Sequence, residues 1–289
     1  MDRIADFRRV FAQVVMARAD CRDPAIHEAF ARVPRHEFVG PGPWYFTERG
    51  GPAESDDPAI LYQDVGMALA RDRGIPTGLP SLHARCIAAC AVRAGERVIH
   101  IGAGSGYYTA ILAELVGEAG QVVAFEIDED LAARARQNLR TWPWARVESM
   151  SAVAIEGPEA DVIYACAGVE ELPQGWLKAL RSGGRLLFPL VPNGEEGAML
   201  LVRDIGSPAL FSAEFICPAR FVPCVGAQDE EARDRLARAF RLKNHESVRS
   251  LGVHPAEPGD SPWFSGSGFW LSTMPAEPDA LHARGPARG

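Results

Sequence analysis

Residues 97–115, RVIHIGAGSGYYTAILAEL, constrain the fold of this chain more than any other stretch. Residues 98–101 form a short run rich in β-branched side chains, and the residues after 106 have apolar side chains at helical spacing. Between them, residues 102–106 include three glycines, which permit positive φ and let a ligand approach the backbone closely. The stretch therefore predicts a strand, a tight turn and a helix whose free N–H groups face a ligand.

A carboxylate downstream of this turn narrows the class of ligand. The glycines follow the spacing G-x-G-x-G, whereas a dinucleotide-binding turn would place its third glycine at position 107, where this chain has Tyr107. A second predicted strand, residues 122–125, ends at Glu126, at the distance where Rossmann-type folds place the carboxylate that binds ribose hydroxyls. This spacing favours a nucleoside without a pyrophosphate, and S-adenosylmethionine is the implied cofactor. The alternative is that Glu126 only caps a helix or faces solvent.

The composition argues against several functional classes. The chain has 289 residues, of which 47% are hydrophobic and 24% charged, as in an ordinary globular protein. Its net charge of −8 disfavours a nucleic-acid surface, which needs clustered Lys and Arg. No apolar run approaches the roughly 20 residues of a membrane helix, and charges interrupt the N-terminal sequence where a signal peptide would be apolar. We expect a cytoplasmic protein without a membrane partner.

The six cysteines give no metal-binding pattern. They are scattered, and the close pair Cys86 and Cys90 has helical spacing without a second pair for zinc. We therefore expect reduced cysteines and no metal site.

The N-terminal part of the chain predicts helices followed by a loop. Two short helices are expected within residues 3–33, with Asp23 as N-cap and Pro24 as the first helical residue of the second. Residues 41–58 are rich in Gly, Pro and acidic residues and are interpreted as a surface loop. A helix beginning at Pro80 is expected to pack on the sheet just before the first core strand.

The rest of the chain predicts an α/β fold, a Rossmann-like, doubly wound and mostly parallel sheet with N-terminal helices and a C-terminal helix–strand extension. The further elements expected are a helix directly after Glu126, strands at 146–149, 161–166, 185–190, 198–202 and 211–221, a helix at 173–180, a charged amphipathic helix at 228–243, and a last strand at 262–272. We divide the chain into an N-terminal helical and substrate-loop region (1–78), a cofactor-binding core (79–226), a C-terminal extension packed on it (227–273) and a disordered tail (274–289).

These features together resemble the protein-L-isoaspartate O-methyltransferase family. The resemblance runs from about residue 14 to residue 226, and its landmarks are VPRHEFV at 33–39, YQD at 62–64, PSLHA at 80–84, the glycine turn, GGRLLFP at 183–189 and RFVP at 220–223. It implies a class I methyltransferase fold and transfer of the methyl group of S-adenosylmethionine to a carboxylate, giving a methyl ester. Such a reaction depends mostly on alignment and desolvation, so no general base is required.

The resemblance also implies a cofactor site, in which two carboxylates of the family are replaced. His100 stands where the family has an acidic residue before the first glycine, and Ser151 stands where the family has the aspartate that contacts adenine. For His100, a buried histidine satisfied by its neighbours is an equal alternative to a cofactor contact. The predicted cofactor-binding residues are His100, Gly102, Gly104, Ser105, Gly106, Tyr107, Glu126, Ile127, Ser151 and Ala152.

The substrate loop departs from the family as well. Where the family carries a serine whose hydroxyl contacts the substrate, this chain has Gly78, which argues against repair of ordinary L-isoaspartyl sites. Thr77 either replaces that hydroxyl or caps the following helix. His83 either contacts the substrate or is a surface or buried histidine of that helix. Thr77, Gly78 and His83 are the predicted catalytic residues.

Two functions of different classes follow. The first is a methyltransferase that acts on a carboxylate of a peptide or small molecule, such as an aspartate in a ribosomally made modified peptide. The second is a non-catalytic partner or sensor that binds S-adenosylmethionine or its product, a hypothesis motivated by His100 and Ser151. Methylation of nucleic acid is disfavoured by charge and by the lack of an Asn/Asp-Pro-Pro-Tyr type motif for a flipped base. The oligomeric state stays open.

Overall fold

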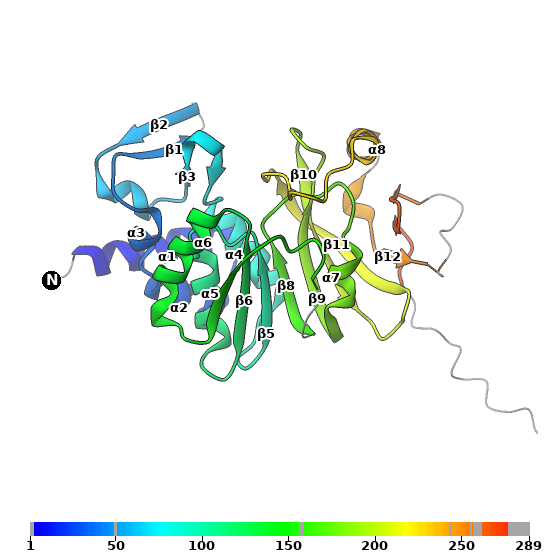
Figure 1. Cartoon of the computed structure of the whole chain (residues 1–289), viewed down its shortest axis with the longest axis horizontal. Coiled ribbons are helices and arrows are strands. Elements are labelled where there is room, and N and C mark those ends of the chain that lie inside the picture. The colour runs from blue at the N-terminus through cyan, green and yellow to red at the C-terminus, as the bar shows by residue number, and fades with distance from the viewer. Residues whose placement is uncertain are drawn as a thin grey trace, which may run out of the picture.

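The computed structural model describes residues 3–48, 51–155, 159–242, 244–254, 256 and 262–276. Its centre is a ten-stranded sheet in the order β13-β14-β12-β11-β10-β9-β8-β5-β6-β7 (Figure 1). Five of these strands run parallel: β5 (Arg97–Ile101), β6 (Gln121–Glu126), β7 (Ala145–Ser149), β8 (Ala160–Ala165) and β9 (Leu180–Leu190). The predicted Rossmann-like α/β fold is confirmed, but the sheet is mixed and not mostly parallel, because all the strands after β9 pair antiparallel.

Helices cover both faces of this sheet. The elements are α1 (Arg3–Ala19), α2 (Pro24–Arg32), α3 (Arg35–Val39), α4 (Pro80–Cys90), α5 (Tyr107–Val116), α6 (Glu129–Asn138), α7 (Gln174–Lys178) and α8 (Glu230–Leu242). On β5, Val98 packs in the apolar layer with α1, α2, α4, α5 and α6, whereas Ile99 packs in the opposite layer with α7 and α8. Because β5 is buried on both faces from Val98 to Ile101, this part of its sequence is apolar apart from His100.

The N-terminal helices form as expected, with the side chain of Asp23 accepting a hydrogen bond from the amide of Ala25 at the start of α2. The prediction of a surface loop at residues 41–58 is wrong. These residues form the hairpin β1 (Trp44–Glu48) and β2 (Gly51–Ser55), which joins β3 (Gly66–Ala70) and β4 (Ile75–Pro76) in a separate four-stranded sheet. This small sheet stands above the N-terminal helices at the upper left of Figure 1.

Arg35 explains why the VPRHEFV segment matters to this N-terminal region. Its side chain is fully buried and donates hydrogen bonds to the carbonyl oxygens of Leu61, Gln63 and Val65 at 2.9, 2.7 and 2.6 Å. The guanidinium therefore fixes the backbone that leads into β3, the strand beside the substrate loop.

The C-terminal part continues the large sheet in antiparallel fashion. β10 (Gly197–Asp204) pairs with β9, β11 (Leu210–Ala219) with β10, and β12 (Ser250–Val253) with β11. β12 was not predicted, and the single predicted strand at 262–272 is instead a short hairpin of β13 (Phe264–Ser265) and β14 (Phe269–Ser272). The helix expected at 173–180 is shorter, because β9 already begins at Leu180.

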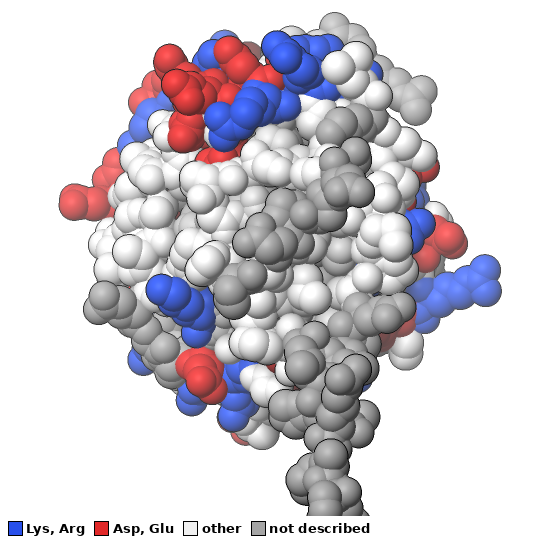
Figure 2. Space-filling view, turned by 90° about the vertical axis from the view of Figure 1, so that its right-hand side faces the viewer, with Lys and Arg blue, Asp and Glu red and all other residues white. Residues whose placement is uncertain are grey.

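The face that these C-terminal strands present is unevenly charged. Figure 2 shows a dense group of acidic and basic side chains along the top of this face, with smaller charged groups at its lower left and right edge, and the described residues between them are largely uncharged. The predicted tail from 274 lies mostly outside the described residues, and the predicted division into regions stays a prediction. No helix within the described ranges is long and apolar enough to cross a membrane.

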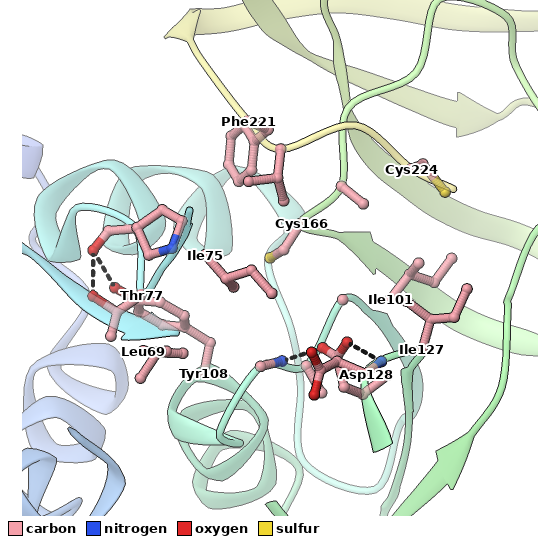
Figure 3. Close-up of a pocket in the computed structure, with 18 of the residues that line it drawn as sticks. Leu69, Ile75, Thr77, Ile101, Tyr108, Ile127, Asp128, Cys166, Phe221 and Cys224 are labelled. Atoms are coloured by element: carbon pink, nitrogen blue, oxygen red, sulfur yellow. Dashed lines mark hydrogen bonds between the residues drawn. The ribbon is translucent and has the colours of Figure 1, made fainter. Parts of the chain in front are cut away.

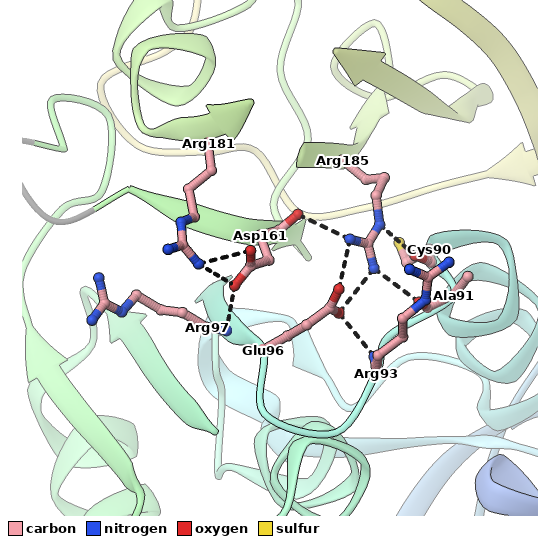
Figure 4. Close-up of polar contacts among 8 residues, drawn as sticks. All are labelled: Cys90, Ala91, Arg93, Glu96, Arg97, Asp161, Arg181 and Arg185. Atoms are coloured by element: carbon pink, nitrogen blue, oxygen red, sulfur yellow. Dashed lines mark hydrogen bonds and ion pairs between the residues drawn. The ribbon is translucent and has the colours of Figure 1, made fainter. Parts of the chain in front are cut away.

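A largely buried ion pair connects the strands at the end of the sheet opposite the glycine turn (Figure 4). The guanidinium of Arg185 on β9 makes two 2.9 Å contacts to the carboxylate of Glu96, and it also donates to the carbonyl oxygens of Cys90 and Ala91 at the end of α4. Beside it, Asp161 on β8 accepts hydrogen bonds from the amide of Arg97 and the side chain of Arg181. These contacts fix the starts of β5, β8 and β9.

Candidate functional site

A cavity of about 660 Å³ opens at the carboxyl ends of β5, β6 and β8 (Figure 3). Ligands of open α/β sheets bind at this edge, where the strand order reverses. Its walls come from the substrate loop between β4 and α4, the glycine turn after β5, the segments after β6, β7 and β8, and residues 220–225 after β11. Eleven of the thirteen predicted site residues line it: Thr77, Gly78, His83, Gly102, Gly104, Ser105, Tyr107, Glu126, Ile127, Ser151 and Ala152.

The glycine turn has the geometry that the sequence predicts. Gly102, Gly104 and Gly106 all have positive φ, at +76°, +56° and +93°. The amide of Gly102 donates to the carbonyl oxygen of Phe125, which ties the turn to β6. Gly106 does not line the cavity, because it is the N-cap of α5 and faces Ala135 of α6 and Leu139, the residue that follows α6. Its role is to begin the helix.

Glu126 lies at the end of β6 and is 7% exposed. Its Oε2 accepts a hydrogen bond from the amide of Gly104 at 2.6 Å, and its Oε1 accepts one from the amide of Asp128 at 3.0 Å. Burial raises the pKa of this carboxyl, and the two amides oppose that rise. Each oxygen keeps lone-pair capacity, so the carboxylate can still accept hydrogen bonds from a diol.

Two residues that line the cavity have buried hydroxyls without a hydrogen-bond partner among the described residues, which bears on whether a polar cofactor fits there. Ser105 Oγ and Tyr107 Oη are buried, and neither has a hydrogen-bond partner among the described residues. A Cβ at Gly104 would lie 3.1 Å from the side chain of Leu69. Buried polar atoms of this kind are normally satisfied, so unpaired hydroxyls beside a glycine cradle and a diol-binding carboxylate fit a nucleoside cofactor with a polar tail.

Three further predicted cofactor residues, Ile127, Ser151 and Ala152, line the cavity. Ile127 is half exposed at the mouth of the cavity, and Ala152 is buried with its carbonyl oxygen bound by the indole of Trp176. Ser151 is exposed, and its Oγ accepts a long hydrogen bond of 3.4 Å from the amide of Val153. Its hydroxyl therefore remains available to a ligand.

His100 does not line the cavity, which contradicts its assignment as a cofactor contact. The alternation along β5 places its ring on the same face as Val98, beside α5, where its Nδ1 lies 2.8 Å from Thr109 Oγ1 and its Nε2 lies 3.4 Å from Cys166 Sγ. Burial lowers the pKa of His100 to about 3, so the ring is neutral. Cys166, which follows β8, covers it and lines the cavity instead.

Thr77 is committed to the fold of the substrate loop. Its Oγ1 accepts a hydrogen bond from the amide of Met67 on β3 and donates one to the carbonyl oxygen of Gly78, both at 3.0 Å. It does not cap α4, because Leu79 is the N-cap and makes no side-chain cap. The helix-capping interpretation is wrong.

Sequence reasoning missed several residues of this cavity. Phe221 and Cys224 reach it from the segment after β11, and Leu69 and Ile75 reach it from the small sheet. Arg73 spans its mouth, 3.1 Å from Asp128 and 3.3 Å from Asp130. The RFVP segment at 220–223 was the available sequence signal for Phe221 and for Cys224 directly after it. Leu69, Ile75 and Arg73 reach the cavity only through tertiary packing.

The sheet order and this cavity define a class I S-adenosylmethionine-dependent methyltransferase. The sequence profile of the family "Protein-L-isoaspartate(D-aspartate) O-methyltransferase" matches residues 11–229. The chain therefore belongs to this family, and it is an enzyme that uses S-adenosylmethionine. When bound, this cofactor supplies an electrophilic methyl group.

Similar proteins cover most of the chain. It is 29% identical over 222 residues to a protein-L-isoaspartate O-methyltransferase of Ignicoccus hospitalis, covering 75% of this chain and 97% of that one. It is 32% identical over 232 residues to protein-L-isoaspartate O-methyltransferase 2 of Pelobacter propionicus, covering 78% and 94%. A solved protein-L-isoaspartate O-methyltransferase superposes with a TM-score of 0.65 at 23% identity, covering 81% and 70%, and supports the fold.

Proposed function

We propose that this enzyme methylates an aspartyl carboxylate in a peptide that is not an ordinary L-isoaspartyl repair site, such as a ribosomally made modified peptide. A lone pair of the acceptor carboxylate forms the new O–CH₃ bond while the S–CH₃ bond breaks and its electron pair stays on sulfur. The products are a methyl ester and S-adenosylhomocysteine, and no proton is transferred. The carboxylate is already nucleophilic, so the protein has to align and desolvate it.

The observation that carries this proposal is the substrate loop. At Gly78, no side chain is present to donate a hydrogen bond, and the neighbouring hydroxyl of Thr77 donates to the carbonyl oxygen of Gly78 itself. A site that binds its substrate through a hydroxyl loses strong discrimination when that donor is removed. The substrate loop therefore supports an acceptor other than that of the relatives named above.

The experiment compares matched peptides. Three peptides of one sequence contain L-isoaspartate, L-aspartate in a linear chain, or L-aspartate in a side-chain-cyclised ring, and each is incubated with labelled S-adenosylmethionine. We expect base-labile label on an L-aspartyl peptide and at least about tenfold less on the L-isoaspartyl peptide. Equal or faster labelling of the L-isoaspartyl peptide would sink the proposal.

The same assay addresses the non-catalytic alternative. A binding partner or sensor would bind S-adenosylhomocysteine in a calorimeter yet transfer no label to any of the three peptides. A methyltransferase would do both.

A further inference from the structure

His83 occupies an unusual position in the cavity. It lies in the first turns of α4, is 1% exposed, and its ring stacks on that of Tyr108 with centroids 3.6 Å apart and an angle of 17°. The ring of Phe221 meets it edge-on at 6.0 Å. Packing between these two rings fixes the orientation of the imidazole before any ligand binds. All three rings line the cavity.

The two nitrogens of this ring have different surroundings. Nδ1 lies 2.8 Å from the hydroxyl of Tyr164, whereas Nε2 is buried without a hydrogen-bond partner among the described residues. Burial lowers the pKa of His83 to about 3, so the ring carries one proton. If Tyr164 donates to Nδ1, only the Nε2–H is left unpaired. The other tautomer would leave both the phenol proton and the Nε2 lone pair unpaired, so the Nε2–H tautomer is favoured.

Gly78 shows where this Nε2–H points. A Cβ atom at position 78 would lie 2.3 Å from His83 Nε2, so the imidazole fills the space that a side chain at position 78 would occupy. Gly78 also has a φ of +78°, which side chains rarely adopt. The hydroxyl of Tyr108 lies 3.5 Å from the carbonyl oxygen of Gly78, and that of Thr77 is engaged. Among the described side chains at this point of the substrate loop, the Nε2–H of His83 is thus a donor without a partner.

We propose that His83 is a substrate-binding residue whose Nε2–H donates a hydrogen bond to the acceptor carboxylate, in the place of a side-chain hydroxyl at position 78. This inference rests on the proposed function. A neutral donor suits the reaction, because it orients one carboxylate oxygen without holding the negative charge as tightly as a cation would. The other oxygen stays free to attack the methyl group.

The test uses two substitutions of His83 and one matched control. His83→Phe keeps the aromatic stack on Tyr108 but removes the donor, and His83→Gln offers an amide N–H at a similar distance from the backbone. The control is His36→Phe, since His36 also pairs through Nδ1 with a tyrosine hydroxyl, that of Tyr62, but lies outside this cavity. Each variant is assayed with the peptide that the unaltered enzyme labels fastest.

We expect His83→Phe to lower kcat/KM for the peptide at least about tenfold, with unchanged affinity for S-adenosylhomocysteine, and His83→Gln to recover part of the loss. His36→Phe should leave kcat/KM unchanged. Full activity of His83→Phe would overturn the inference alone, whereas no labelling by the unaltered enzyme would overturn the proposed function and this inference with it. Nitrogen-15 spectra of histidine-labelled enzyme should show a neutral His83 protonated at Nε2, and a proton on Nδ1 would also overturn it.

Discussion

The amide nitrogen of Gly104 lies 2.6 Å from Oε2 of Glu126, so the glycine turn and the end of β6 share one carboxylate. The turn therefore does more than make room for a ligand. It orients the carboxylate and offsets part of the cost of burying its charge. The glycine turn and Glu126, the two parts of the predicted cofactor site, are thus joined by a direct hydrogen bond.

Glu126→Ala should weaken binding of S-adenosylhomocysteine by about 1 to 3 kcal/mol, because charge-assisted hydrogen bonds to the ribose would be lost. Isothermal titration calorimetry measures this directly. Glu129→Ala is the control, since that exposed side chain lies outside the cavity three residues further on. Equal affinities of Glu126→Ala and the unaltered enzyme would contradict the assigned role.

Acid should destabilise the protein through its two buried histidines. His83 and His100 have pKa values lowered to about 3 by burial, whereas an unfolded histidine titrates near its ordinary value of about 6.5. Between these values only the unfolded chain binds the protons, so the free energy of unfolding falls as pH falls, by up to about 1.4 kcal/mol per pH unit for each ring. Denaturant titrations from pH 7 to pH 4 measure this slope, and His100→Asn should reduce it.

Glu96→Ala should lower the free energy of unfolding by about 2 to 4 kcal/mol, because Arg185 would be left as a largely buried charge without its carboxylate. Glu195→Ala is the matched control, since it breaks an exposed pair with Arg241 and should cost less than about 1 kcal/mol. Urea denaturation distinguishes them. Similar losses in the two variants would show that the Arg185 pair is no more important than a surface contact.

Gly78→Ser should not create activity on L-isoaspartyl peptides. The added Cβ would meet His83 Nε2 at 2.3 Å, and the φ of +78° would strain the new residue. We expect a lower melting temperature and less labelling of the preferred peptide. Gly95→Ser, with a φ of +82° and open space around it, isolates the backbone strain from the clash. A Gly78→Ser enzyme that gains L-isoaspartyl activity would contradict this prediction.

Truncation after Gly226 should abolish soluble expression. Leu236, Trp263 and Leu271 are buried in one apolar cluster, and the ring of Trp263 packs on Phe215 of β11 at 5.3 Å. Without them this apolar face would be exposed. Light scattering and thermal melting of the shortened chain, beside a chain lacking only residues 277–289, provide the comparison. A stable monomer ending at Gly226 would show the prediction wrong.

Local patterns in the sequence were sufficient for the core of the fold. The strand, glycine turn and helix around Gly104 depend on neighbouring residues, and so does the position of Glu126 after β6. The face of β5 on which His100 lies was harder to predict from the sequence. His100 lies in a strand buried on both faces, so no polar–apolar alternation indicates which face it occupies.

The errors have a common physical origin in contacts between distant residues. Residues 41–58 look like a loop because they are rich in Gly, Pro and acidic residues, yet pairing of Phe46 with Met67 of β3 stabilises the hairpin of β1 and β2 as part of a sheet. The spacing of α4 likewise marks His83 as helical, but only the packed structure shows its ring beside Gly78. Such arrangements depend on backbone positions far apart in the sequence.

The strand order of the large sheet also bears on how copies of this chain behave at high concentration. One outer strand, β13, has only two residues, and the other, β7, carries Arg146 and Glu148. Very short or charged outer strands are poor templates for hydrogen bonding to a strand of another molecule. The outer strands β13 and β7 therefore disfavour the addition of a strand from another molecule to this ten-stranded sheet, which is the first step toward fibrous aggregates.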